Sequence, residues 1–201
     1  MMTNKTISDA GKNSPLLGSW DTVGVGGGSA GASAAISSAR GGCATLLIDK
    51  SIRMGGTATN ALVTPMMKSF TGHRSNFFDL EDKLHELGFA TRDEIGTEMR
   101  WFTPEAMAEA LETMYTQAGG EILYDTVLSD CITENGRICT LIVTTVQGLC
   151  AVKGTNFVDA SGDAVLTRAA GVPTVHGDDN GNNQMTSLRF EMGGIDAETY
   201  R

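Results

Sequence analysis

A glycine-rich turn between a short apolar strand and a helix of small residues is the feature that most constrains this chain. The turn is Gly26-x-Gly28-x-x-Gly31, after an expected strand over residues 22–25 and before an expected helix over residues 29–40. In this pattern the first glycine permits a tight turn, the second lets the backbone approach a pyrophosphate, and the third lets the helix pack closely on the strand. The pyrophosphate would lie at the helix N-terminus, where free N–H groups and the helix dipole attract it.

The next expected strand, residues 43–48, completes a β-α-β unit and ends at Asp49, 18 residues after Gly31. An acidic residue about 20 residues beyond such a glycine motif accepts a hydrogen bond from a ribose 2′-hydroxyl, and it would repel a 2′-phosphate. The unit is therefore expected to bind an adenine dinucleotide that lacks this phosphate. These features alone do not distinguish NAD from FAD.

Composition and charge exclude several other classes of function. The 201 residues carry a net charge of −9, from 15 basic and 24 acidic side chains, so nucleic-acid binding is not expected. The chain has no run of about 18 apolar residues that would span a membrane. The first residues also lack the apolar core of a secretory signal, so we expect a cytoplasmic protein with reduced cysteines. The cysteines and histidines show no zinc-ligand spacing, and no metal site is expected.

Two changes of periodicity follow the β-α-β unit. A helical insert is expected over about residues 60–118, with helices over residues 75–87 and from Thr103 onward. A further helical stretch is expected to follow Thr57 to about residue 67, interrupted at Pro65.

From about residue 121 to residue 159 the pattern is that of strands, with a hairpin signal at Asn135-Gly136, and it predicts a small antiparallel meander. A helix over residues 164–170 and a strand over residues 187–192 should follow, and another helix should start near residue 197. Along the whole chain we expect a flexible tail over residues 1–18, one domain over residues 19–175, and the beginning of a second domain over residues 176–201.

Four ordered motifs now make a family resemblance specific. They are GVGGGSAGASAAISSARGGCATLLIDKSIRMGGTATNALVTPMM, FTPEAMAEALETMYTQAGGEILYDTVLSD, FVDASGDAVLTRAAGVP and NQMTSLRFEMGGID. Over about residues 20–196 the chain resembles the FAD-dependent oxidoreductases with a glutathione-reductase-type FAD domain, in the broad group that includes fumarate reductase flavoproteins. In that group a second Gly-Gly closely follows the acidic residue, as Gly55-Gly56 does here, and a turn reads Ala-Thr-Gly-Asp, where this chain has Ser161 in place of threonine.

The resemblance implies an α/β fold, with a Rossmann-like FAD-binding domain that contains a parallel core sheet and an antiparallel β-meander, followed by the start of a substrate domain. It also implies which residues hold the cofactor. By resemblance, the pyrophosphate would be held by Gly26, Gly28 and Gly31, and the adenosine ribose by Asp49. The pyrophosphate and ribityl region would be lined by Arg53, Gly55, Gly56 and Thr57, and Leu128 would offer backbone groups to the adenine. The turn over the pyrophosphate would be closed by Ala160, Gly162 and Asp163. Some relatives attach the flavin covalently to a histidine in the segment GGTATNA, which has none here, so FAD is expected to bind non-covalently.

The implied function is an FAD-dependent oxidoreductase that transfers a hydride or two electrons between a small-molecule substrate and an electron acceptor, both unidentified. No catalytic residue can be named. The chain stops where a substrate domain would begin, so we expect a C-terminally truncated member of the group. Two alternatives stay open: a non-catalytic dinucleotide-binding fragment, and an NAD-dependent dehydrogenase, which is less favoured because such enzymes usually continue with further β-α units. Oligomer formation also stays open.

Overall fold

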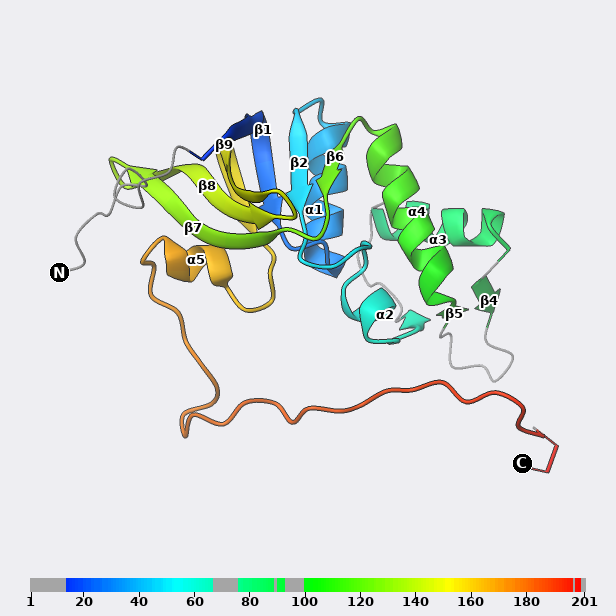
Figure 1. The fold of residues 1–201 in the computed structure, drawn as a ribbon. Coiled ribbons are helices and arrows are strands. Elements are labelled where there is room, and N and C mark those ends of the chain that lie inside the picture. The colour runs from blue at the N-terminus through cyan, green and yellow to red at the C-terminus, as the bar shows by residue number, and fades with distance from the viewer. Residues whose placement is uncertain (1–13, 67–75, 89, 93–99, 197, 200–201) are drawn as a thin grey trace.

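The computed structural model describes residues 14–66, 76–88, 90–92, 100–196 and 198–199 of the chain. Its elements follow one another in this order: β1 (Leu16–Val25), α1 (Ser29–Arg40), β2 (Thr45–Ile48), α2 (Thr57–Asn60), β3 (Pro65–Met66), α3 (Asn76–Glu86), β4 (Ala90–Arg92), β5 (Arg100–Phe102), α4 (Pro104–Gln117), β6 (Glu121–Leu123), β7 (Val127–Glu134), β8 (Arg137–Thr145), β9 (Gly148–Asp159) and α5 (Val165–Ala169). Figure 1 shows α1 between the main sheet and the helices α3 and α4, with α5 near β7.

The main sheet holds six strands in the order β6-β2-β1-β9-β8-β7. The pairs β6–β2, β2–β1 and β1–β9 are parallel, and the pairs β9–β8 and β8–β7 are antiparallel. This topology confirms the predicted α/β fold with a parallel core and an antiparallel meander. One assignment was wrong: β6, which the sequence grouped with the meander, extends the parallel edge beside β2.

The first strand begins earlier than the sequence indicated. β1 starts at Leu16 rather than at Thr22, and its first half pairs in parallel with β9, as in the register Trp20↔Gly154. Residues 16–18 therefore belong to the sheet and not to a flexible tail, and residues 1–13 of that expected tail lie outside the described residues. The local sequence gave no sign of this strand because its stabilising partner, β9, is distant along the chain.

Two apolar cores lie on opposite faces of the parallel strands. On one face, Leu47 packs with α1, α3 and α4 in a cluster that includes Ile36, Leu111 and Tyr115. On the other face, Leu46 and Ile48 pack with β1, β8, β9 and α5. Because side chains alternate along a strand, the fully buried β2 supplies both cores, and three of its four residues, 46–48, are apolar.

Several local signals are confirmed. Thr103 caps α4, because its hydroxyl accepts a hydrogen bond from the backbone N–H of Ala106 (3.3 Å), and Pro104 occupies the first turn. Asn135 and Gly136 both have positive φ angles (51° and 76°), as a two-residue hairpin with a type I′ turn requires. Within the described residues, every helix is too short or too polar to cross a membrane.

The helical insert and the C-terminal segment differ from expectation. The helix after Thr57 ends at Asn60, because Leu62 takes a left-handed conformation (φ 55°) and Pro65 begins a strand of a second, three-stranded sheet, β3-β5-β4. Residues 187–192 form no strand. They belong to an exposed, extended segment that leaves α5 and runs along one side of the molecule (Figure 1), where Arg189 Nη1 donates a hydrogen bond to the Leu62 carbonyl (2.9 Å). Most of the helix expected near residue 197 lies outside the described residues.

Tyr115 joins the insert to the sheet through its phenol. The side chain is fully buried, and burial raises the pKa of its hydroxyl above the usual range. The hydroxyl lies 2.8 Å from the Thr45 carbonyl oxygen and 3.1 Å from the Glu121 carbonyl oxygen, at the starts of β2 and β6. One donor from α4 therefore serves two adjacent strands of the parallel sheet.

Replacing Tyr115 with phenylalanine should lower the free energy of unfolding by about 1–2 kcal/mol, because two buried carbonyl groups lose their shared donor. Urea denaturation followed by circular dichroism measures the change. Tyr124→Phe is the matched control, since the Tyr124 hydroxyl donates to Glu112 in a half-buried position and its loss should cost less. Equal stability of Tyr115→Phe and the wild type would contradict the bridging role.

Candidate cofactor site

Gly26 and Gly31 shape the turn that leads from β1 into α1. Gly26 has a φ of 99°, and a Cβ on it would lie 2.5 Å from the Ala160 carbonyl oxygen. A Cβ on Gly31 would lie only 1.7 Å from the Gly26 carbonyl oxygen. Both distances are far below van der Waals contact, so the turn, the helix and the Ala160 segment can approach this closely only with glycine at these two positions.

Gly28 and Gly56 bring a second turn against the first. Gly28 has an ordinary φ of −67°, and the nearest atom to a Cβ on it would be the Gly56 Cα, at 3.9 Å. Gly56 has a φ of 57°, and a Cβ on it would meet the Gly28 Cα at 2.7 Å. The Gly55 N–H also donates a hydrogen bond to the Gly27 carbonyl (2.8 Å). Packing thus requires glycine at position 56, whereas at position 28 a Cβ would fit without a clash and would take up room before the N-terminus of α1.

Asp49 lies at the carboxyl end of β2, and only 9% of its surface is exposed. One carboxylate oxygen accepts a hydrogen bond from the Gly27 N–H, and the other accepts from the Ser51 N–H (2.6 Å) and the Ser51 hydroxyl (2.5 Å). These three donors fix the carboxylate beside the glycine turn. Because an ionised carboxylate offers about four acceptor positions, Asp49 can still accept from a ligand hydroxyl.

Asp159 fixes a third turn, at the end of β9. Its carboxylate accepts hydrogen bonds from the Ser161 N–H (3.2 Å) and hydroxyl (2.7 Å), and from the Thr167 N–H (2.8 Å) and hydroxyl (2.7 Å). The Ser161 hydroxyl oxygen also accepts from the Val165 N–H (3.0 Å). Burial alone would raise the pKa of Asp159, but these hydrogen bonds outweigh it and lower that pKa below its usual range.

The three turns line one cavity of about 580 Å³, within the size range of small-molecule sites. It lies at the carboxyl ends of β1, β2 and β9, where open α/β sheets bind ligands. The cavity brings together nine of the residues assigned from sequence: Gly26, Gly28, Asp49, Gly56, Thr57, Leu128, Ala160, Gly162 and Asp163.

Three assigned residues do not line this cavity. Gly31 packs beneath the turn, and Gly55 lines a neighbouring cavity. Arg53 donates to the Asn60 side chain (3.1 Å) and the Thr59 carbonyl (3.1 Å), and its guanidinium lies 3.4 Å from Glu105 of α4. In the structure Arg53 therefore holds the loop after β2 against α4.

Sequence reasoning missed other residues around this cavity. The lining also includes Ser29, Ala30, Lys50, Ser51, Asn60, Thr126 and Ser161. A signal for two of them was present, because Asp49-x-Ser51 and Asp159-x-Ser161 both have the spacing at which an aspartate side chain accepts from the backbone two residues on. Among the described residues, no group of three or more His, Cys, Asp or Glu side chains is placed to hold a metal ion.

Replacing Asp159 with asparagine should destabilise the third turn in a pH-dependent way. Because the fold lowers the pKa of Asp159, its contribution to stability is complete above about pH 4, the unfolded value, and is lost as the pH falls through the lowered value. In urea denaturation the wild type should be more stable than Asp159→Asn at pH 7, and the gap should narrow at pH 3. Asp163→Asn, an exposed charge change in the same turn, should behave as the wild type. A gap of equal size at both pH values would contradict this prediction.

Comparison with known proteins now identifies the family. A family model described as FAD dependent oxidoreductase matches residues 21–201, and none of the curated proteins searched matches the chain. One similar solved structure is that of THI4 from Thermovibrio ammonificans. It is 18% identical, with a TM-score of 0.57, and the match covers 77% of this chain and 64% of that one. A geranylgeranyl bacteriochlorophyll reductase-like protein from Thermoplasma acidophilum is 19% identical, with a TM-score of 0.59 and coverage of 77% and 42%.

The structure of L-proline dehydrogenase from P. horikoshii is 16% identical, with a TM-score of 0.57 and coverage of 80% of this chain and 57% of that one. The chain thus spans less than two thirds of each of these proteins. At such identities the structures show a shared fold, and the family is shown by the model that matches nearly the whole sequence. The resemblance read from the motifs is confirmed: the chain belongs to the FAD dependent oxidoreductase family, and its cofactor is FAD.

Proposed function

We propose that the 580 Å³ cavity binds FAD non-covalently and that the protein uses it to transfer a hydride or two electrons between a small-molecule substrate and an electron acceptor. The observation that carries the proposal is the convergence of three fixed turns, after β1, β2 and β9, on one cavity. Each turn is held by contacts of its own, so the cavity walls are in place before a ligand arrives. Such preorganisation lowers the entropic cost of binding.

The polarity of the cavity wall fits a dinucleotide. The pyrophosphate would bind before the first turn of α1, where Gly28 leaves space and the cap position has no side-chain hydrogen bond. Asp49 would accept from the adenosine ribose, and Leu128 would face the adenine. The turn over Ala160, Gly162 and Asp163 would cover the pyrophosphate from the opposite side.

We assign the remaining wall, at Gly56 and Thr57, to the ribityl side of the cofactor. Gly31, Gly55 and Arg53 then act indirectly, because they fix the two glycine turns and the loop without lining this cavity. When bound, FAD supplies the two-electron chemistry, and the protein supplies position and electrostatics. A nicotinamide cofactor in its place is disfavoured by the family match.

The proposal is tested by titrating the purified 201-residue chain with FAD and with NAD in parallel. Flavin fluorescence reports the first and calorimetry the second. We expect saturable FAD binding with little NAD binding, and a yellow protein after purification. Binding of NAD without FAD, or of neither by a folded chain, would overturn the proposal.

Two alanine substitutions within the same glycine motif should separate cofactor binding from folding. Gly28→Ala places its methyl group in ordinary van der Waals contact, 3.9 Å from the Gly56 Cα, so the variant should keep wild-type stability. Its FAD affinity should fall about tenfold or more, because the methyl group occupies the pyrophosphate position. Gly31→Ala drives its methyl group into the Gly26 carbonyl and should lose more than about 3 kcal/mol of stability. Circular dichroism with urea measures the stability, and flavin fluorescence measures the binding. Undiminished FAD affinity in Gly28→Ala would place the pyrophosphate elsewhere.

A further inference from the structure

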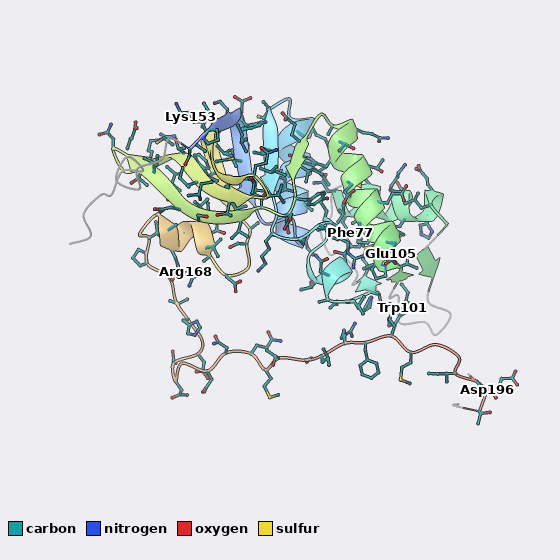
Figure 2. The ribbon with its side chains drawn as sticks, in the orientation of Figure 1. Phe77, Trp101, Glu105, Lys153, Arg168 and Asp196 are labelled. Carbon is teal, nitrogen blue, oxygen red and sulfur yellow. The ribbon has the colours of Figure 1, made fainter. Side chains whose placement is uncertain are left out.

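A second cavity, of about 390 Å³, lies between α1 and the helical insert, and we call it the insert chamber. Its floor is formed by buried side chains of α1, β5 and α4, namely Ile36, Phe102, Met107 and Leu111. Its walls include the half-buried Phe77 and Leu80 of α3, and Figure 2 labels Phe77, which belongs to the first turn of that helix.

The lining of the insert chamber selects for an uncharged ring. Among the described residues, none of its lining side chains is an aspartate, glutamate, lysine, arginine or histidine, so a charged ligand would lose its hydration without gaining a partner. Phe77 and Phe102 offer ring faces and edges, and the thioethers of Met66 and Met107 favour contact with aromatic rings. The volume is at the lower end of the range for small-molecule sites.

The insert chamber adjoins the proposed cofactor cavity. Ser29, in the first turn of α1, and Thr57, at the start of α2, line both cavities. Within the described part of the chain, neither hydroxyl makes a hydrogen bond. The Asn76 amide, by contrast, already has partners within the protein, because it donates hydrogen bonds to the Ser33 carbonyl (2.9 Å) and to the Ser37 hydroxyl (2.8 Å). Polar groups for a ligand are therefore concentrated at the shared wall, beside the cofactor.

We propose that the insert chamber receives the substrate of the flavin reaction and that this substrate is an uncharged molecule with a planar apolar ring. The ring would lie among Phe77, Phe102 and Met107, and its polar group would face Ser29 and Thr57. This inference rests on the proposed function, because the chamber opens beside the cavity assigned to FAD.

The test uses 2-naphthol, an uncharged, fluorescent, planar ring compound, titrated into the full chain with and without FAD. We expect saturable binding in both cases and a shift of the flavin absorption band when FAD is present. Naphthalene-2-sulfonate has the same ring with a negative charge, and its affinity should be at least about tenfold lower than that of 2-naphthol.

Two variants fill the insert chamber from different elements. Val63→Trp adds a ring at a partly exposed position of the lining, where folding is least at risk, and Leu80→Trp adds one from α3. Each should weaken 2-naphthol binding about tenfold or more while FAD binding stays as in the wild type. Ile52→Trp is the matched control, since Ile52 is 77% exposed and lines neither cavity.

The outcomes separate the two proposals. If the chain binds FAD but not 2-naphthol, or if Val63→Trp leaves the 2-naphthol affinity unchanged, the insert chamber is not the substrate site. The proposed function then still stands. A chain that binds 2-naphthol but not FAD overturns the proposed function, and with it the substrate role. Binding of 2-naphthol and FAD together without any change in the flavin spectrum also overturns the substrate role.

Discussion

The contact between Gly31 and the Gly26 carbonyl sets the geometry on which the rest of the structure depends. With no side chain at position 31, α1 lies against the end of β1, and Ile36 on the same helix reaches the core shared with the insert. This placement points the first turn of α1 at the carboxyl ends of the parallel strands. The proposed cofactor cavity and the insert chamber both begin at that turn, because Ser29 lines both.

The two strands beside β1 lead into turns that are held in the same way, by an aspartate carboxylate. β2 and β9 flank β1 in parallel. Asp49 directly follows β2 and Asp159 is the last residue of β9, and each carboxylate accepts hydrogen bonds from the serine two residues on. Asp49 uses its other oxygen to hold the Gly27 N–H, whereas Asp159 uses its other oxygen to hold Thr167 in α5. One aspartate therefore ties its strand to the glycine turn and the other ties its strand to the following helix, so that both sides of the cavity are fixed by buried or half-buried carboxylates.

The sequence was informative where the signal and its partner lie close together in the chain. The β-α-β unit, the Thr103 cap and the Asn135-Gly136 hairpin are of this kind, and the structure contains all three. The glycine motif and Asp49 could be placed at one site for the same reason. The first half of β1 and the pairing of β6 with β2 could not be predicted, because each depends on a strand far away in sequence. The direction of Arg53 also depends on a distant partner, Glu105 of α4.

The loop after β2 links the two cavities physically. Gly56 packs against Gly28 on one side, Gly55 lines the insert chamber, and Arg53 fixes the loop to the Thr59 carbonyl. The same short segment is thus a wall of both cavities, held by steric contact at the glycines and by the guanidinium at its base. Arg53 also lies 3.4 Å from Glu105 of α4, and α2 packs on the same helix, so the loop that lines both cavities rests directly on the insert.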